Sequence, residues 1–117
     1  MIPWSPLAMG YLARPHDSFK DSERGDSLGG TFMGNPITAA DEKINSKIEE
    51  IAKKMGTTMA IVATAWSLSK PYMTAPIVGM GKIERVDEAV KAVHFKLSSE
   101  EVESIDKLYE PKKIYAI

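Results

Sequence analysis

The clearest pattern of hydrophobic and polar positions lies in the second half of the chain. The apolar run Pro76–Val78 stops at Gly79, which is typical of a short buried strand in a parallel sheet. Beyond it, apolar residues recur with the period of one helix face: Val86, Ala89, Val90 and Val93. The pattern therefore predicts a strand, a glycine-bearing turn and an amphipathic helix over residues 74–92.

Periodicity also predicts two helices before this strand. Thr38 is placed to cap a helix that reaches about Met55, and Gly56 is placed to end it. Residues 59–69 are apolar nearly all round, so we expect this second helix to be covered by other elements on most sides. We expect Trp66, which lies in it, to be a core residue rather than a ligand contact.

The two ends of the chain are less regular. Residues 1–4 predict a second short strand, and residues 14–36 predict a long loop, because glycines and charges of both signs interrupt any periodicity. The middle part of this loop is interpreted as a solvated insertion. Ser98 and Glu101 match a capping box that begins a last helix, and Pro111 ends it.

The predicted order is strand, loop, two helices, strand and two helices, which is typical of a parallel α/β arrangement. Two strands cannot form a stable parallel sheet among this much helix, so the strand at residues 76–78 needs neighbouring strands that these residues do not supply. We therefore interpret residues 1–117 as the C-terminal part of a larger α/β domain.

Composition excludes several classes of function. A net charge of −1 provides no basic surface for nucleic acid and no polybasic patch for a membrane. The absence of cysteine excludes thiol catalysis, disulfides and Cys-based zinc sites, and we expect no metal site. No apolar run approaches the roughly 20 residues of a membrane-spanning helix, and no signal-peptide pattern is seen. We expect a soluble cytoplasmic protein.

The turn after the 76–78 strand holds the candidate chemistry. Gly79 and Gly81 allow a sharp turn and a close approach to a ligand, while Lys82 and Arg85 lie where a helix N-terminus disfavours cations unless an anion is near. Together with free helix N–H groups, these features describe a phosphate site. The alternative is a simple βα loop with solvated cations, and the local pattern does not decide between the two.

The segments Trp4–Leu7, Gly10–Leu12, Pro76–Gly79 and Arg85–Ala89, taken in order, resemble the aldo-keto reductase family, in particular its fungal aryl-alcohol dehydrogenase-like members. The resemblance implies a (β/α)8 barrel, which needs about 250 residues, that binds NADPH and reduces aldehydes and ketones. This chain would supply the last two strands, their helices and the C-terminal helix. Phosphate sites of such barrels often lie on the loops after strands 7 and 8.

The resemblance implies cofactor-binding roles for ten residues: Trp4, Ser5, Leu7, Arg14, Gly79, Met80, Gly81, Lys82, Arg85 and Glu88. Trp4 matches the aromatic residue that stacks on the nicotinamide ring, although a buried strand tryptophan is the alternative. Ser5 and Leu7 match positions lining the pyrophosphate, and Arg14 reaches the cofactor from the loop.

The remaining positions match the adenosine end of the cofactor. Residues 79–82 match the loop around the adenosine phosphate, and Arg85 matches the cation that pairs with the 2′-phosphate. Glu88 matches a position that contacts adenine. Two positions depart from the family pattern: Met80 replaces a hydroxyl residue, and Ala89 replaces an asparagine that bonds the base.

The resemblance implies that the catalytic tyrosine, lysine, aspartate and histidine belong to the earlier half of the barrel. None of the tyrosines here occupies a matching position: Tyr11, Tyr72, Tyr109 and Tyr115. We therefore predict no catalytic residue in this chain and no carbonyl reduction by it alone, with a carbonyl substrate bound only if the rest of the barrel is supplied.

Two alternatives stay open. The chain is a non-catalytic nucleotide-binding or interaction module, or it is the product of a truncated gene. In each case we expect exposed barrel edges to favour self-association.

Overall fold

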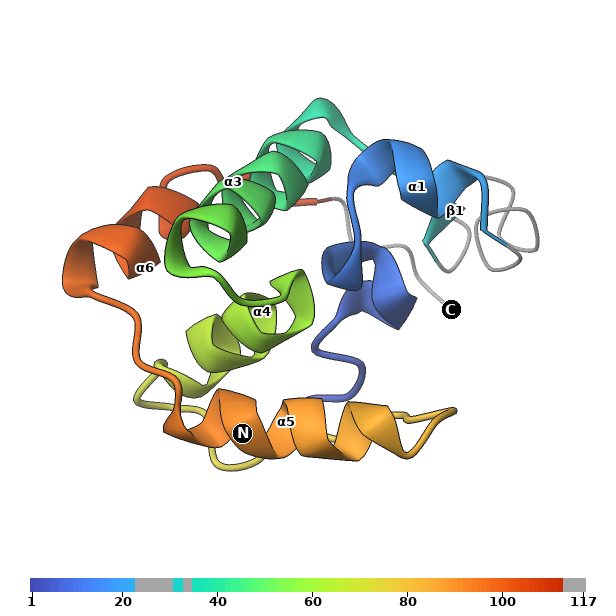
Figure 1. The fold of residues 1–117 in the computed structure, drawn as a ribbon. Helices are drawn as coiled ribbons and strands as arrows, with labels where there is room; N and C mark the ends of the chain where they lie inside the picture. The colour runs from blue at the N-terminus through green and yellow to red at the C-terminus, as the bar shows by residue number, and fades with distance from the viewer. Residues whose placement is uncertain (23–30, 33–34, 113–117) are drawn as a thin grey trace.

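The structure, a computed structural model, describes residues 1–22, 31–32 and 35–112. Short helices η1 and α1 and a small antiparallel hairpin precede four longer helices (Figure 1). The elements are η1 (Ala8–Ala13), α1 (His16–Lys20), β1 (Thr31–Phe32), β2 (Asn35–Pro36), α3 (Ala39–Met55), α4 (Met59–Leu68), α5 (Glu84–His94) and α6 (Ser99–Asp106). None of the helices described is long and apolar enough to cross a bilayer.

Helix α4 lies at the centre of the fold, with α3 on one side and α5 on the other (Figure 1). Eight of its ten residues are buried, which confirms that this all-apolar helix is covered on most sides. Val62 and Ala63 are almost inaccessible and pack in one cluster with Ile48 and Ile51 of α3 and Ile105 of α6. Three helices therefore share one core, and α4 runs through it.

The helix ends confirm the capping predictions. The Thr38 hydroxyl accepts a hydrogen bond from the Asp41 N–H while the Asp41 carboxylate accepts from the Thr38 N–H, and Gly56 ends α3 with a left-handed φ of 64°. Ser98 and Glu101 form the same reciprocal pair at the start of α6. These ends depend on residues three positions apart, which explains why the sequence reveals them.

The prediction of strands at residues 1–4 and 76–78 is wrong. Trp4 and Ile77 form one isolated parallel bridge, in which the Ile77 N–H donates to the Pro3 carbonyl (2.8 Å) and the Ser5 N–H donates to the Ile77 carbonyl (3.1 Å). Ile77 is 54% exposed, although the pattern predicted a buried strand. In the part of the chain that the structure describes, no third strand lies beside this pair, so neither segment gains the neighbours that define a sheet.

The apolar stripe of α5 is formed but not covered. Val86, Val90 and Val93 are about half exposed or more, and Ala92 is the residue that packs inward against α4. Trp66 differs from its prediction as well, because it lies at the edge of the core and its Nε1 donates to Asp106 (2.8 Å). The helix was predicted correctly, but its apolar face has no partner among the described residues.

The predicted long loop contains more structure than expected at its two ends. Helix α1 begins shortly after Arg14, and the β1–β2 hairpin lies just before α3. The predicted solvated insertion lies in residues 23–30 and 33–34, outside the described residues. His16, at the start of α1, has a structural role: its ring contacts the Tyr11 hydroxyl (3.0 Å) and the Glu42 carboxylate (3.3 Å).

We expect Ser98→Ala to destabilise the chain by about 1 kcal/mol, because the substitution removes the side-chain acceptor for an otherwise unsatisfied N–H of α6. Ser99→Ala is the matched control, since Ser99 is the next residue, is exposed and does not cap the helix. Urea unfolding followed by circular dichroism measures both. Equal midpoints for the two variants would contradict the assigned cap.

The two capping carboxylates also predict a loss of stability in acid. Burial acts to raise the pKa of Asp41, but hydrogen bonds from Lys112 and Thr38 outweigh it and hold that pKa below its ordinary value. The Ser98 N–H, with Lys54, lowers the pKa of Glu101. A pKa lowered in the folded state gives stability that is present above the ordinary carboxyl pKa, about 4, and is lost as the pH falls through the folded value.

We therefore expect the free energy of unfolding to fall below about pH 4, and Asp41→Asn to flatten that fall while lowering stability at neutral pH. Urea unfolding at a series of pH values measures it. An unchanged acid slope in Asp41→Asn would show that this carboxylate is not held in the charged form.

Candidate cofactor site

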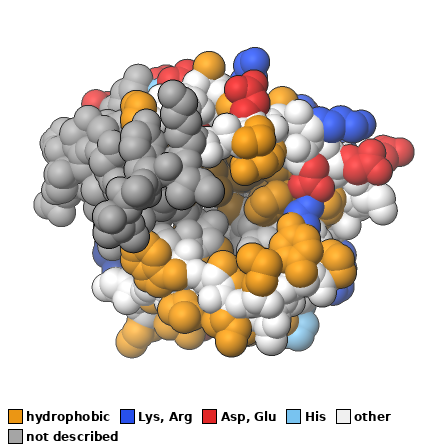
Figure 2. All heavy atoms as spheres, turned by 180° about the vertical axis from the view of Figure 1, so that it is seen from behind, with side chains coloured by type: hydrophobic (Ala, Val, Ile, Leu, Met, Phe, Trp, Pro, Cys, Tyr) orange, Lys and Arg blue, Asp and Glu red, His pale blue; other side chains and the backbone are white. Residues whose placement is uncertain are grey.

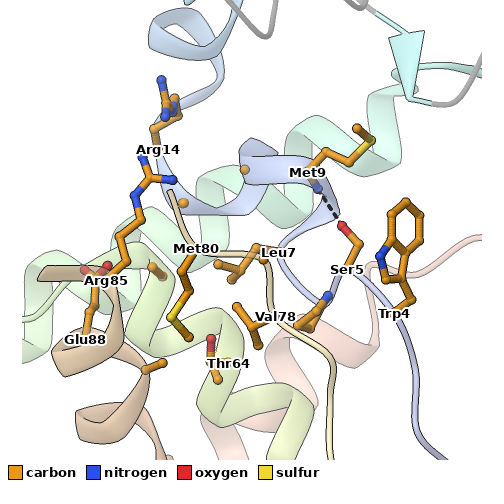
Figure 3. A pocket seen from close by; sticks show the side chains of 16 residues that line it. Trp4, Ser5, Leu7, Met9, Arg14, Thr64, Val78, Met80, Arg85 and Glu88 are labelled. Carbon is orange, nitrogen blue, oxygen red and sulfur yellow. Dashed lines mark hydrogen bonds between the residues drawn. The ribbon is translucent and has the colours of Figure 1, made fainter. Parts of the chain in front are cut away.

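A cavity of about 510 Å³ lies between three parts of the fold (Figure 3). One wall is the segment at residues 4–7 with η1 and Arg14, and another is the turn at residues 78–80 with the first two turns of α5. Ala60 and Thr64 of α4 complete the lining between them. The central helix therefore fixes the separation of the two walls.

Eight of the ten predicted cofactor residues line this cavity: Trp4, Ser5, Leu7, Arg14, Gly79, Met80, Arg85 and Glu88. They come from positions more than 60 residues apart in the sequence and meet only through the fold. Gly81 and Lys82 do not line it, and both are exposed. The structure places the residues together, and cofactor binding by them stays a prediction.

Two cations lie at one end of the cavity. Figure 3 shows the Arg85 side chain, on α5, reaching toward Arg14, with Glu88 beside it and Trp4 at the opposite end. Among the described residues, neither arginine forms an ion pair. Two guanidinium groups of like charge and without carboxylate partners favour an anion between or beside them.

The first turn of α5 adds to this end of the cavity. Ile83, the residue before the helix, makes no side-chain capping hydrogen bond. The first N–H groups of α5 are therefore not satisfied by a capping side chain. Glu88 accepts a hydrogen bond from the Thr58 hydroxyl at the start of α4, which fixes its carboxylate. Glu84 and Asp87 place negative charge in the same turn, which weakens the attraction of this helix end for an anion.

The backbone of the turn does not need the glycines that the sequence places there. Neither Gly79 nor Gly81 has a positive φ, and a Cβ placed on either would meet nothing within 4 Å. The chain itself therefore does not require glycine at these positions. Only close approach by a ligand would require it, and that part of the prediction is untested.

Trp4 is 60% exposed, so the alternative of a buried strand tryptophan is wrong. The parallel bridge to Ile77 holds its backbone, while the ring stays open to solvent at the cavity's far end (Figure 3). A large aromatic face held in place but uncovered is suited to stacking on a planar group.

The segment after Trp4 is wound tightly. Ser5, Ala8 and Met9 have φ values of 56°, 48° and 54°, a left-handed conformation that costs non-glycine residues about 1–3 kcal/mol each. The Ser5 hydroxyl accepts from the Met9 N–H (3.0 Å), and the Ser5 carbonyl accepts from the Ala8 N–H (3.0 Å). Local hydrogen bonds offset part of the strain, and packing and longer-range contacts must offset the remainder.

Asn45 provides such a contact, and sequence reasoning missed it. Its side chain is fully buried in α3, and its Nδ2 donates to the carbonyls of Tyr11 (2.7 Å) and Arg14 (2.9 Å). One amide therefore holds the end of η1 and the backbone of Arg14 against α3. The available signal was a polar residue next to Ile44 and on the same face as Ile48.

Among the described residues that line the cavity, none is a tyrosine, lysine, aspartate or histidine. The ionisable residues in its lining are Arg14, Arg85 and Glu88. Burial, with the charges of Asp41 and Glu42, raises the pKa of Tyr11, whose hydroxyl pairs with His16 away from the cavity lining. Tyr115 lies outside the described residues. Within the described residues, no cluster of His, Cys, Asp or Glu is arranged to hold a metal.

A second cavity, of about 450 Å³, lies between α3, α4 and α6. Its charged groups already have partners: Lys70 pairs with Asp106 (2.6 Å) and lies over the Trp66 ring, and Asp41 pairs with Lys112 (2.6 Å). No unpaired charge is left there to orient a ligand, and the first cavity is the better candidate site.

The family model described as Aldo/keto reductase family matches residues 1–110. The chain belongs to the aldo-keto reductase family. It is 41% identical over 116 residues to a versiconal hemiacetal acetate reductase of Aspergillus parasiticus, an alignment that covers 98% of this chain and 34% of that protein.

Two further relatives agree with this assignment. A putative aryl-alcohol dehydrogenase of Schizosaccharomyces pombe is 41% identical over 114 residues (97% of this chain, 32% of that protein). An aldo-keto reductase of Alternaria alternata is 38% identical over 109 residues (93% and 29%). The resemblance to fungal members is thus confirmed.

The chain spans about a third of the length of these relatives. The family is one of carbonyl oxidoreductases with a (β/α)8 barrel, and a mostly helical chain of this length is consistent with a portion of one.

We expect Asn45→Ala to destabilise the chain by about 1–3 kcal/mol, because the buried carbonyl of Tyr11 and the partly buried carbonyl of Arg14 lose their donor. Ser46→Ala, at the next position on α3 and exposed, is the matched control. Urea unfolding gives the stabilities, and amide hydrogen exchange in residues 8–14 reports whether η1 is loosened. Unchanged exchange in Asn45→Ala would show that Asn45 does not hold η1.

Proposed function

We propose that this chain is the C-terminal, NADP(H)-binding portion of a carbonyl-reducing aldo-keto reductase. The observation that carries the proposal is the cavity in which eight of the predicted residues meet. Two arginines without an ion-pair partner among the described residues lie at one end, and an open tryptophan lies at the other. The family uses nicotinamide cofactors, which supply the hydride in carbonyl reduction.

The residues present fit such a cofactor. The adenosine end of NADP(H) carries a 2′-phosphate, and a planar guanidinium binds phosphate oxygens in pairs. Arg85 supplies that group from α5, and Arg14 adds a second charge from the other wall. Trp4 offers its face to the nicotinamide, and the Ser5–Leu7 wall lies on the cavity between them.

The same lining favours separate roles for this chain and for the rest of the barrel. Carbonyl reduction needs a proton donor near the carbonyl oxygen in addition to the hydride. Among the described lining residues, the ionisable groups are Arg14, Arg85 and Glu88, and the Glu88 carboxylate accepts a hydrogen bond from the Thr58 hydroxyl. This chain would bind and orient the cofactor, and the acid would come from the rest of the barrel.

A second function follows if no other part completes the site. The chain would then be a nucleotide-binding module without catalysis, an alternative favoured because no tyrosine is among the described residues that line the cavity. Both functions require the same nucleotide site, so one binding experiment tests the part they share.

We expect Arg85→Ala to weaken NADPH binding about ten- to a hundredfold, the loss typical of a hydrogen bond to a charged group. NADH binding should change much less, because NADH lacks the 2′-phosphate. Lys91→Ala is the matched control: it removes one positive charge from an exposed position of the same helix, away from the cavity. Titration followed by tryptophan fluorescence measures the affinities.

Trp4→Phe should remove most of the fluorescence response, because the other tryptophan, Trp66, lies outside this cavity. Equal affinities in Arg85→Ala and Lys91→Ala would contradict the phosphate role of Arg85. Steady NADPH oxidation on addition of an aromatic aldehyde to the chain alone would contradict the proposal that the proton donor comes from the rest of the barrel.

A further inference from the structure

The floor of the cavity carries a hydroxyl group that has no partner in the described part of the chain. Thr64 lies in the middle of α4, is 5% exposed and lines the cavity. Among the described residues, none donates to its hydroxyl oxygen or accepts from it, and that oxygen opens onto the cavity instead of being sealed in the interior. Sequence reasoning did not include Thr64 among the cofactor residues.

This free hydroxyl is unusual for a buried helix position. A threonine inside a helix can donate to the carbonyl four residues earlier, here that of Ala60, but Thr64 makes no such hydrogen bond. Burying a hydroxyl without a partner is unfavourable, and valine would fill nearly the same volume without that cost. A polar group left unsatisfied at a cavity wall therefore points to a partner from outside the chain.

The surroundings of Thr64 are apolar. Its neighbours Ala63 and Ala65 in α4 are buried, and Figure 2 shows hydrophobic side chains gathered over the lower part of the molecule, at the level where Figure 1 places α5 and the N-terminus. Residues near the N-terminus and the start of α5 form the two walls of the cavity. A hydrogen bond made in such a setting is stronger than one made in water, because the local dielectric constant is low.

The position of Thr64 indicates which part of a dinucleotide it would meet. Figure 3 shows its oxygen directed into the cavity beside Met80 and Val78, between the end that holds Arg85 and the end that holds Trp4. With the 2′-phosphate at Arg85 and the nicotinamide at Trp4, the diphosphate that joins the two nucleotides of NADP(H) crosses the floor at Thr64.

A neutral donor suits this part of the cavity. The cations among the described lining residues are Arg14 and Arg85, and both lie at the 2′-phosphate end. A threonine hydroxyl rotates to donate one hydrogen bond, and hydrogen bonds to ionised acceptors are stronger than those between neutral groups. The Thr64 hydroxyl can therefore bind a diphosphate oxygen away from the arginines.

We propose that the Thr64 hydroxyl donates a hydrogen bond to the diphosphate of bound NADP(H). This inference rests on the proposed nucleotide site, and it adds to that site a binding residue on the central helix.

Variants of the full 117-residue chain isolate the hydroxyl. Thr64→Val keeps the shape of the side chain and removes the hydroxyl, so it should weaken NADPH binding about tenfold or more, whereas Thr64→Ser should bind almost as tightly as the unaltered chain. Ser67→Ala is the matched control, because it removes a buried hydroxyl of the same helix outside the cavity and should leave the affinity unchanged. Titrations followed by tryptophan fluorescence measure the affinities.

Two smaller ligands locate the contact. Adenosine 2′-monophosphate carries the phosphate for Arg85 but no diphosphate, and 2′-phospho-ADP-ribose carries both but no nicotinamide. Measured by displacement of NADPH, Thr64→Val should weaken binding of 2′-phospho-ADP-ribose about tenfold and leave that of adenosine 2′-monophosphate unchanged. Arg85→Ala should weaken binding of both ligands.

Thermal unfolding without any ligand tests the premise separately. Because Thr64→Val removes a group that has no partner in the folded chain, its unfolding midpoint should equal or exceed that of the unaltered chain. A lowered midpoint would show that the hydroxyl is satisfied within the fold, and it would overturn the inference.

The binding data can overturn the inference in three further ways. Equal NADPH affinity in Thr64→Val and the unaltered chain, with Arg85→Ala still weakened, would remove the role of Thr64 and leave the nucleotide site in place. Thr64→Ser as weak as Thr64→Val, or an equal loss for adenosine 2′-monophosphate, would show that the hydroxyl does not bind the diphosphate. Absence of NADPH binding by the unaltered chain would overturn the proposed function as well.

Discussion

The packing of α4 between α3, α5 and η1 is the constraint on which the other features depend. Its alanines, such as Ala60 and Ala63, let neighbouring helices approach closely, and Val62 fills the centre with almost no exposure. Interiors packed at this density transmit displacements instead of absorbing them. Because α4 separates the two walls of the cavity, its position sets how far Arg85 lies from Arg14 and Trp4. The same helix therefore supports both the core and the candidate site.

The cavity wall formed by residues 5–14 shows how the core supports a strained segment. Three of its residues have left-handed backbone conformations that non-glycine residues avoid. They persist because the surroundings fix them, and the buried amide of Asn45 does so by bonding two backbone carbonyls at once. Strain concentrated beside a cavity is consistent with a wall preorganised for a ligand. The proposed nucleotide site thus depends on an asparagine that would not contact the nucleotide.

The sequence predicted helices better than strands for a physical reason. Thr38, Gly56 and Ser98 act on residues within one helical turn, so the bounds of α3 and α6 could be read from local spacing. The segments at residues 1–4 and 76–78 had the right pattern for strands but lack the neighbouring strands that burial would require. For the site, family resemblance found eight of the lining residues. The signal for Asn45, a polar residue on an apolar helix face, was missed, and the left-handed wall gave no readable signal.

By itself, the sequence determined the four longer helices, the caps of α3 and α6, the family and the candidate cofactor residues. These follow from interactions over a few residues or from matches of short segments taken in order. Only the tertiary structure decided that Arg14 and Arg85 share one end of a cavity, where neither pairs with a described carboxylate. It also decided that Gly81 and Lys82 lie outside the cavity and that the stripe of α5 is exposed. Distances between residues far apart in the chain depend on how helices pack around α4, and no local pattern encodes that packing.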